Sequence, residues 1–393
     1  MKALRWHGKE RVSIDKVPLP AITEPKDVIV RITGTTVCGS DLHLYHGEIL
    51  QLKDGDIFGH EFMGIVDEVG PEVTKVKKGD RVVASFQIAC GECKMCKEGL
   101  TSMCDTTNSS TVQEKMYGRK LAGIFGYSHF TGGYAGGQAE YARVPFGDAN
   151  LLKIPDHVPD EKALYLSDIV PTSYHAVKCA DGKEGSIVGI WGLGPIGLLA
   201  ARWAQLEGAK RVIGIDNVKE RIDLAKEKLG IDIINFDEVK DVVDEIHKFE
   251  PQGVDCAIDA AGFRYAKSIA DKVQRAIGLE TDTSETVNEI LRSTRKFGTI
   301  SLIADYAATT NKFLIGALME KGIILRGAGQ CPVQMYWHGL LKKIQDGVDE
   351  FAELYNAFDK KQYGIMKTFI ETRFSTPPTA GTSQTPSLKA GNF

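Results

Sequence analysis

The residues GLGPIG at positions 192–197 constrain the fold of this chain more than any other feature. They follow a short run rich in β-branched residues and lead into an apolar pattern with helical spacing that begins at Pro195. A Gly-x-Gly-x-x-Gly sequence in this context is typical of a dinucleotide-binding turn. Gly192 permits the tight turn, Gly194 lets the backbone approach a pyrophosphate, and Gly197 lets the helix pack closely on the strand.

The expected helix begins at Pro195, followed by Ile196. Its N-terminus presents free N–H groups and the positive end of the helix dipole to the phosphates of a dinucleotide. Asp216 follows the next apolar run, where a carboxylate accepts hydrogen bonds from ribose hydroxyls and repels a 2′-phosphate. We therefore expect NAD rather than NADP as the cofactor. Lys219 and Arg221 keep NADP open as an alternative, because either side chain could reach a phosphate instead of lying on a solvated helix face.

Strand-like and helical patterns alternate from about residue 165 onward. Strands are expected at 186–191, 211–215, 254–258, 298–303 and 322–325, helices at 195–206 and 218–229, and a largely helical stretch at 264–297. This alternation predicts an α/β fold built from βαβ units around a parallel sheet. In the first half, runs of β-branched residues at 28–32, 64–69 and 81–84, separated by Gly, Pro and Asp, predict a β-rich domain.

The length of 393 residues predicts two domains. The formal charge of -4 provides no basic field for nucleic acid or an anionic membrane. The sequence contains no run of about 18 apolar residues, so we expect no transmembrane helix. The first residues do not resemble a secretory signal. We therefore expect a cytoplasmic protein. Residues 375–393 are rich in Ser, Thr, Pro and Gly, and we expect this tail to be disordered.

Four of the eight cysteines lie close together in the sequence, at Cys90, Cys93, Cys96 and Cys104. In a reducing compartment, clustered cysteines are metal ligands more often than disulfides. Four thiolates at this spacing predict a closed, tetrahedral structural zinc site. We expect Cys179, Cys256 and Cys331 to be small buried side chains.

A second group of metal-binding residue types is spread along the chain. The sequence CGSDLH at 38–43 is followed by GHE at 59–61. Cys38 and His60 alone are weak evidence for a metal site, because an isolated histidine is usually structural.

Taken in order, CGSDLH, GHE, the four spaced cysteines and GLGPIG resemble the zinc-dependent medium-chain alcohol dehydrogenase family over nearly the whole chain. The resemblance implies a GroES-like catalytic domain at 1–166 and 330–374, with a Rossmann domain at 167–329 inserted between its two parts. It also implies two zinc ions per chain and NAD. Relatives are dimers or tetramers, so a homo-oligomer is expected.

The same resemblance implies that Cys38 and His60 bind the catalytic zinc. Many relatives use a cysteine as the third ligand, and here Asp168 takes its place. The thiolate and the carboxylate still neutralise Zn²⁺. The run LSDIVPTSYH at 166–175 resembles the glutathione-independent formaldehyde dehydrogenases and aldehyde dismutases. Those enzymes carry a Gly-rich insertion that encloses the cofactor, whereas the equivalent segment 263–283 is expected to be helical here.

The activity implied is transfer of a hydride from an alcohol or aldehyde hydrate at the zinc to NAD, with formaldehyde as the favoured substrate. By resemblance, Ser40 takes the substrate proton and His43 passes it toward solvent. Asp41 orients His60. Glu61 either exchanges onto zinc or only neutralises local charge.

Two alternatives remain at this stage. One is a secondary-alcohol or polyol dehydrogenase on the same scaffold, which differs in pocket size. The other is a catalytically idle protein that binds NAD or zinc. A catalytically idle protein would not require Ser40 together with Cys38, His60 and Asp168. The presence of all four residues therefore argues against this alternative.

Overall fold

The computed structural model describes residues 1–261, 282–306, 309–346, 369–375 and 388–389. These residues form two compact units. The first unit contains Met1–Pro171 together with the described residues from Pro332 onward, and the second contains Thr172–Cys331. Asp168 therefore belongs to the first unit.

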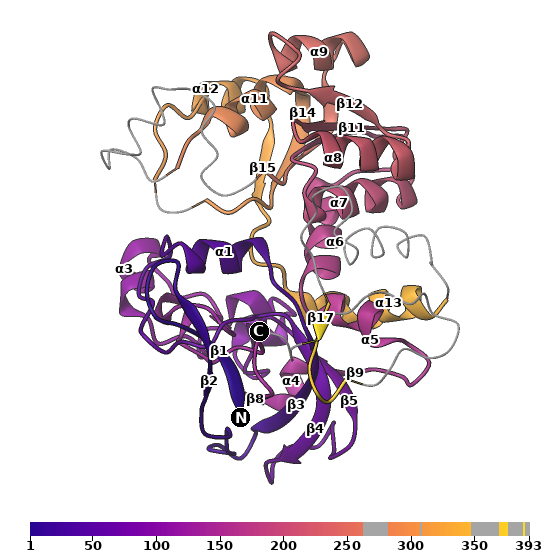
Figure 1. The fold of residues 1–393 in the computed structure, drawn as a ribbon. Helices are drawn as coiled ribbons and strands as arrows, with labels where there is room; N and C mark the ends of the chain where they lie inside the picture. Colours follow the sequence, from indigo (N-terminus) through magenta and orange to yellow (C-terminus); the bar gives the residue numbers. More distant parts are fainter. Residues whose placement is uncertain (262–281, 307–308, 347–368, 376–387, 390–393) are drawn as a thin grey trace. The chain divides into compact units, whose positions relative to one another are not determined.

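The first unit is rich in β-structure (Figure 1). Its strands are β1 (Lys2–Trp6), β2 (Val12–Lys16), β3 (Val28–Thr35), β4 (Phe62–Val69), β5 (Arg81–Ala84), β6 (Gln87–Ile88), β7 (Gly123–Ile124), β8 (Tyr141–Val144), β9 (Leu151–Lys153), β16 (Ile370–Glu371) and β17 (Leu388–Lys389). The main sheet has the order β17-β16-β3-β4-β5-β9, and β8 also pairs with β3. The strands β1 and β2 form one antiparallel pair, and β6 and β7 form another.

Short helices connect these strands. They are α1 (Gly39–Tyr45), α2 (Lys94–Lys97), α3 (Thr111–Tyr117), α4 (Gly147–Asn150), α5 (Asp160–Ala163) and α13 (Val333–Gln345), with 3-10 turns η1 (Thr101–Met103), η2 (His129–Thr131) and η3 (Leu164–Ser167). Val30, Ile32 and Phe62 are fully buried in the core of the sheet, where Phe62 packs edge-on against Phe125. Nearly every residue of β3 is buried, so β3 and the neighbouring β4 form the centre of this unit.

The second unit contains one parallel sheet in the order β12-β11-β10-β13-β14-β15. The strands are β10 (Ile187–Trp191), β11 (Arg211–Asp216), β12 (Asp232–Asn235), β13 (Val254–Asp259), β14 (Thr294–Leu302) and β15 (Ile324–Gly327). The order reverses between β10 and β13, as in a doubly wound sheet that binds dinucleotides.

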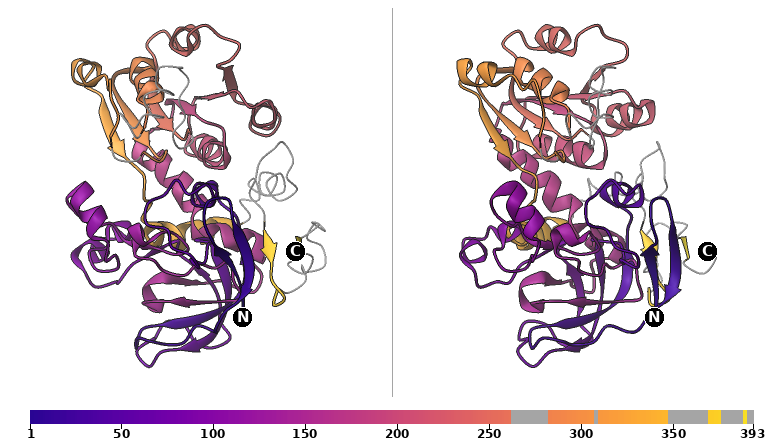
Figure 2. Two further views of the ribbon diagram at one scale, coloured as in Figure 1. Left: turned by 60° about the vertical axis from the view of Figure 1, so that its left-hand side comes forward. Right: turned by 90° about the vertical axis from the view of Figure 1, so that its left-hand side faces the viewer.

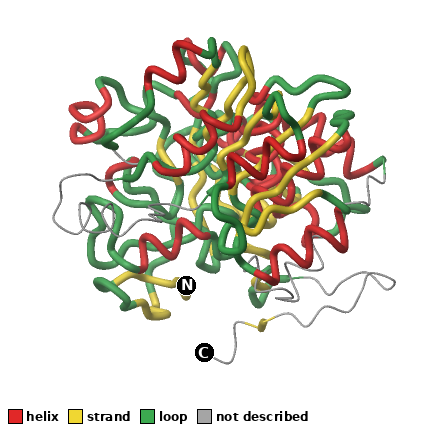
Figure 3. Tube along the Cα trace, turned by 90° about the horizontal axis from the view of Figure 1, so that it is seen from above, coloured by secondary structure: helices red, strands yellow, loops and turns green. Residues whose placement is uncertain are grey.

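Helices lie on both sides of this sheet (Figures 2 and 3). They are α6 (Ile169–Ala180), α7 (Pro195–Leu206), α8 (Lys219–Leu224) with a π turn η4 (Ala225–Leu229), α9 (Val242–Phe249), α11 (Glu285–Ser293) and α12 (Ile315–Glu320). The helix α7 packs on β10 and β11, and α11 packs on β13 and β14. No helix of the described residues is long and apolar enough to span a membrane.

One expectation from the sequence needs correction, and two others concern segments that lie mostly outside the described residues. The helical stretch expected up to residue 297 ends at Ser293, and β14 already begins at Thr294. Most of segment 263–283 and most of the tail after Ser375 lie outside the described residues. Within that tail, β17 pairs with β16.

Candidate functional site

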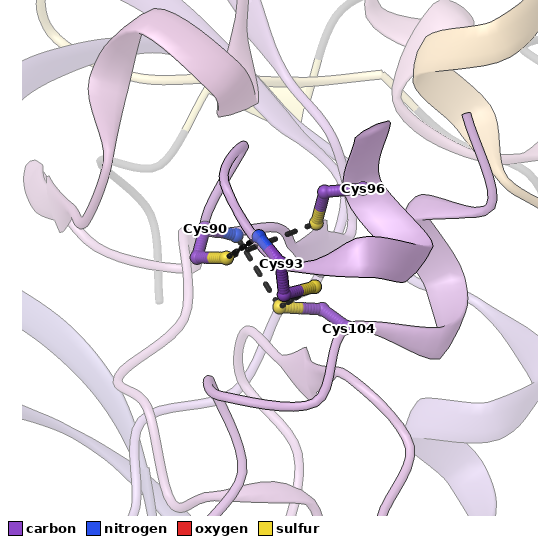
Figure 4. Close-up of side chains that lie close together, drawn as sticks. All are labelled: Cys90, Cys93, Cys96 and Cys104. Atoms are coloured by element: carbon purple, nitrogen blue, oxygen red, sulfur yellow. Dashed lines mark hydrogen bonds between the residues drawn. The ribbon is translucent and has the colours of Figure 1, made fainter. Parts of the chain in front are cut away.

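The four clustered cysteines converge in the first unit (Figure 4). The Sγ atoms of Cys90 and Cys96 lie 3.9 Å apart, as do those of Cys93 and Cys104. A zinc ion with four Zn–S bonds of about 2.3 Å needs sulfur atoms about 3.8 Å apart. The geometry of the donor set therefore fits a tetrahedral zinc ion.

Hydrogen bonds favour the thiolate form in this cluster. The backbone N–H of Cys90 donates to Sγ of Cys104 at 3.4 Å, and the N–H of Cys93 donates to Sγ of Cys90 at 3.3 Å. Burial raises the pKa of Cys104, but hydrogen bonds from Thr106 and from the Cys90 backbone outweigh burial and lower this pKa to about 6. The loop thus supports an ionised sulfur at Cys104, whereas burial raises the pKa of the Cys96 thiol.

Of the other cysteines, Cys256 and Cys331 are buried, as expected. Cys179 is only half-buried, and its sulfur lies 3.4 Å from Nε2 of His175.

A second donor cluster brings together Cys38, His60, Glu61 and Asp168, whose ligand atoms all lie within 4.8 Å of one another. Nε2 of His60 is 3.7 Å from a carboxylate oxygen of Glu61 and 3.7 Å from one of Asp168. A thiolate, an imidazole and carboxylates are ligand types that zinc accepts. These donors therefore also fit a metal ion.

Antiparallel pairing explains how residues far apart in the sequence reach this cluster. Thr35 at the end of β3 pairs with Phe62 at the start of β4. Cys38 follows β3 and His60 precedes β4, so both lie at the same end of this strand pair. The backbone N–H of Phe86 donates to Ser167 O at 3.1 Å, which ties the segment carrying Asp168 to the sheet.

Asp41 links the two segments that provide Cys38 and His60. Its Oδ2 accepts the backbone N–H of Cys38 at 2.9 Å, and its Oδ1 lies 3.3 Å from Nδ1 of His60. Burial disfavours the charged imidazole, but the Asp41 carboxylate outweighs it, so the pKa of His60 is well above its ordinary value. A carboxylate on Nδ1 directs Nε2 toward the other donors.

Two aromatic side chains that the sequence did not single out lie beside His60. The rings of Phe86 and Tyr127 each approach its ring edge-on, with centroids 6.2 Å away. Neither residue belongs to a motif, and only the folded loops bring them together.

The two proton-relay candidates occupy different surroundings. The hydroxyl of Ser40 donates to Sγ of Cys38 at 3.4 Å, so it lies beside the donor cluster. Nδ1 of His43, on the same helix α1, lies 2.6 Å from the carboxylate of Glu48 and is partly exposed.

The glycine run of the second unit forms the turn between β10 and α7. Gly192 has a φ of +90°, which favours glycine. A Cβ on Gly197 would lie 1.8 Å from Gly192 O, whereas a Cβ on Gly194 would meet nothing within 4 Å. Pro195 and Ile196 open α7, with Gly194 as its N-cap. The turn therefore leaves the backbone at Gly194 open to a ligand.

Asp216 ends β11 beside this turn. Its carboxylate accepts backbone N–H groups of Leu193 at 2.7 Å and of Asn217 and Val218, each at 2.8 Å. Nη1 of Arg221 lies 3.6 Å from Oδ2 of Asp216. Asp216 is buried and thus holds the glycine turn in place.

Two family models match this chain. Residues 24–156 match the alcohol dehydrogenase GroES-like domain, and residues 195–346 match the zinc-binding dehydrogenase domain. A zinc-type alcohol dehydrogenase-like protein of Schizosaccharomyces pombe is 45% identical, with 94% of this chain and 91% of that protein covered.

Further similar proteins agree with these matches. A glutathione-independent formaldehyde dehydrogenase of Pseudomonas aeruginosa is 33% identical over 92% of this chain and 95% of its own. The alcohol dehydrogenase of Thermus sp. ATN1 has a TM-score of 0.77 at 30% identity, with 95% of this chain and 100% of that chain covered. With the two metal-compatible donor sets and the dinucleotide turn, these matches show that the chain belongs to the zinc-dependent medium-chain alcohol dehydrogenase family and is an oxidoreductase that uses zinc and NAD.

Proposed function

We propose that this enzyme oxidises formaldehyde, as its hydrate, with NAD and without glutathione. The observation that carries the proposal is the position of Asp168, whose carboxylate lies in one donor cluster with Cys38 and His60. Cys38, His60 and Asp168 would hold the catalytic zinc, and Cys90, Cys93, Cys96 and Cys104 the structural zinc. The first unit would thus be the catalytic domain and the second the NAD-binding domain.

A small substrate is favoured by the surroundings of His60. The rings of Phe86 and Tyr127 both lie edge-on to the imidazole, which places rigid aromatic side chains beside the donor cluster. The similarity to a formaldehyde dehydrogenase and the run at 166–175 support the same substrate class.

When bound, zinc supplies a Lewis acid for the substrate oxygen, and NAD supplies the hydride acceptor. The hydrate loses one hydride and one proton and leaves as formic acid. Ser40 lies beside Cys38 and would receive the proton at Oγ. His43, paired with Glu48 at the surface, would exchange protons with solvent.

Asp41 and Glu61 would act on the metal site without receiving the substrate proton. Asp41 would orient His60 through Nδ1. The buried carboxylate of Glu61, 3.7 Å from Nε2 of His60, is close enough to replace another oxygen ligand.

For the cofactor, we propose that Gly192, Gly194, Pro195, Ile196 and Gly197 hold the pyrophosphate and that Asp216 binds the adenosine ribose. Arg221 lies 3.6 Å from Asp216 and would limit the negative charge there. Its guanidinium also makes NADP a cofactor worth testing.

Reduced, metal-binding thiolates in such number favour a cytoplasmic location.

We also propose that a second copy of the chain is the partner of the second unit. Phe297, Ile315, Met319 and Ile324 are between 48% and 79% exposed. Ile315 and Met319 share one face of α12, and the backbone N–H of Phe297 donates to Lys321 O at the end of that helix. In the described part of the chain, β15 is the last strand of its sheet. An apolar surface next to a sheet edge is suited to pairing with its own copy.

The test is an initial-rate assay on the purified protein with formaldehyde and NAD⁺, without glutathione. NADP⁺ and a series of primary and secondary alcohols are assayed in parallel. We expect formaldehyde to give the highest kcat/KM. Oxidation of a larger alcohol without formaldehyde turnover would contradict the substrate while leaving the zinc site intact.

A further inference from the structure

One buried amide joins the two chain segments that carry Cys38 and His60. Nε2 of Gln138 lies 3.1 Å from Oδ2 of Asp41 and 3.1 Å from the carbonyl oxygen of Thr36. Both neighbours are acceptors, so the amide nitrogen rather than the oxygen must face them. The side chain is 8% exposed, so water does not compete freely for these bonds.

The backbone of Gln138 contacts the other segment. Its N–H donates to Phe58 O at 2.9 Å, two residues before His60. Gly59 lies against Gln138, since a Cβ on Gly59 would come within 2.6 Å of its Cγ and backbone nitrogen. Gly59 also has a φ of +97°. This close approach brings the amide between the two segments.

The hydrogen bonds of Asp41 determine what the amide controls. Its Oδ2 accepts from both the Cys38 backbone and Gln138, and its Oδ1 lies 3.3 Å from Nδ1 of His60. Two donors on one oxygen, from different directions, fix the plane of the carboxylate. The direction of Oδ1, and with it the ring of His60, then follows from the position of Gln138.

We propose that Gln138 is a positioning residue for the catalytic metal site: through Asp41 it sets the orientation of His60, and through Thr36 and Phe58 it holds the segments of Cys38 and His60 together. This inference rests on the proposed role of Cys38, His60 and Asp168 as zinc ligands. Groups that orient a histidine ligand typically alter metal affinity by about 10- to 100-fold when they are removed.

The experiment measures zinc release to a chelator from wild type and Gln138→Met, which keeps the bulk and removes the donor. The four-cysteine site in the same unit is the internal control, because the side chain of Gln138 is hydrogen-bonded to Thr36 and Asp41 and, among the described residues, to none of these cysteines. We expect one zinc to be bound about 10- to 100-fold more weakly and the other to be unchanged. Equal retention of both ions in Gln138→Met and wild type would overturn the proposal.

Gln138→Glu provides a second variant in case the methionine fails to fold, since it keeps the shape and places an oxygen opposite Asp41. Its cobalt-substituted form should show altered visible absorption from the Cys38–His60 site only. The matched control is Gln113→Met, which changes a buried glutamine that bonds Asn108 and the Leu121 backbone. It should leave both metal sites unchanged.

Failure of the proposed ligand set of Cys38, His60 and Asp168 would look different. In that case wild type itself would retain only the zinc of the four cysteines. Wild type with two ions and a Gln138 variant that behaves identically contradicts the positioning role alone.

Discussion

Oδ2 of Asp168 lies 3.7 Å from Nε2 of His60, although the two residues come from distant parts of the sequence. An oxygen donor thus stands where many relatives are expected to place a sulfur. In the proposed zinc site, the third donor would therefore be a hard oxygen rather than a soft sulfur.

Replacing Asp168 tests this arrangement. We expect Asp168→Ala to bind one zinc ion instead of two and its kcat/KM to fall at least about 100-fold. The reason is that Cys38 and His60, even with Glu61 nearby, would bind the catalytic zinc only weakly. Asp168→Cys should restore the second zinc. Metal content by atomic emission, with kinetics, checks both. Full turnover with two zinc ions in Asp168→Ala would exclude a ligand role.

Ser40→Ala removes the hydroxyl beside Cys38. The expected result is a kcat lower by about 10²- to 10⁴-fold, the usual contribution of a positioned acid or base. Zinc content should stay at the wild-type value. Ser13→Ala, which changes an exposed hydroxyl bonded to Asp15, is the control. Loss of metal in Ser40→Ala would point to a structural role instead.

Cys104→Ala opens the four-sulfur site. Structural zinc contributes folding free energy directly, so we expect the Tm to fall by at least about 10 °C. A fall of this size in Tm corresponds to a loss of several kcal/mol, on the order of magnitude expected here, in the free energy of unfolding. Differential scanning calorimetry measures the change. Cys179→Ala, a half-buried cysteine outside both donor sets, should shift the Tm much less.

Asp216→Ala tests the cofactor site. The KM for NAD should rise by about 10- to 100-fold, since a hydrogen bond to a charged group contributes about 1.5–3 kcal/mol. The KM for formaldehyde should change little. Because Asp216 also accepts three backbone N–H groups, Asp216→Asn separates the charge from the turn. An unchanged KM for NAD in both variants would exclude the ribose contact.

Met319→Glu places a charge in the middle of the exposed apolar surface of α12 and β15. We expect the oligomer to dissociate, as seen by sedimentation velocity. Leu19→Glu, at another exposed apolar residue, should keep the wild-type mass. A monomeric wild type would rule out the proposed self-association.

The sequence predicts the second unit well where local signals agree. The helix α7 has the expected bounds because the glycine turn, Pro195 and the apolar spacing all point to one start and one end. The start of β14 was wrong because Thr294–Phe297 is polar or exposed and continues the amphipathic pattern of α11. Thr294 pairs with Val254 of β13 ahead of a register shift, and no local pattern reveals this long-range pairing.

The two donor clusters also differ in how far local sequence predicts them. The spacing of the four cysteines is local, and the structure brings these residues together. Cys38, His60 and Asp168 meet only because of strand pairing and a loop contact, so their prediction depended on family resemblance. Phe86, Tyr127 and Gln138 belong to no recognisable pattern, because their roles arise from tertiary contacts.

All donors of both clusters precede Ile169, whereas the parallel sheet begins at Ile187. During synthesis, the residues of both donor clusters found among the described residues therefore leave the ribosome before the parallel sheet is translated. Both donor sets are thus complete in the sequence before the C-terminal residues of their own unit, from Pro332 onward, are translated.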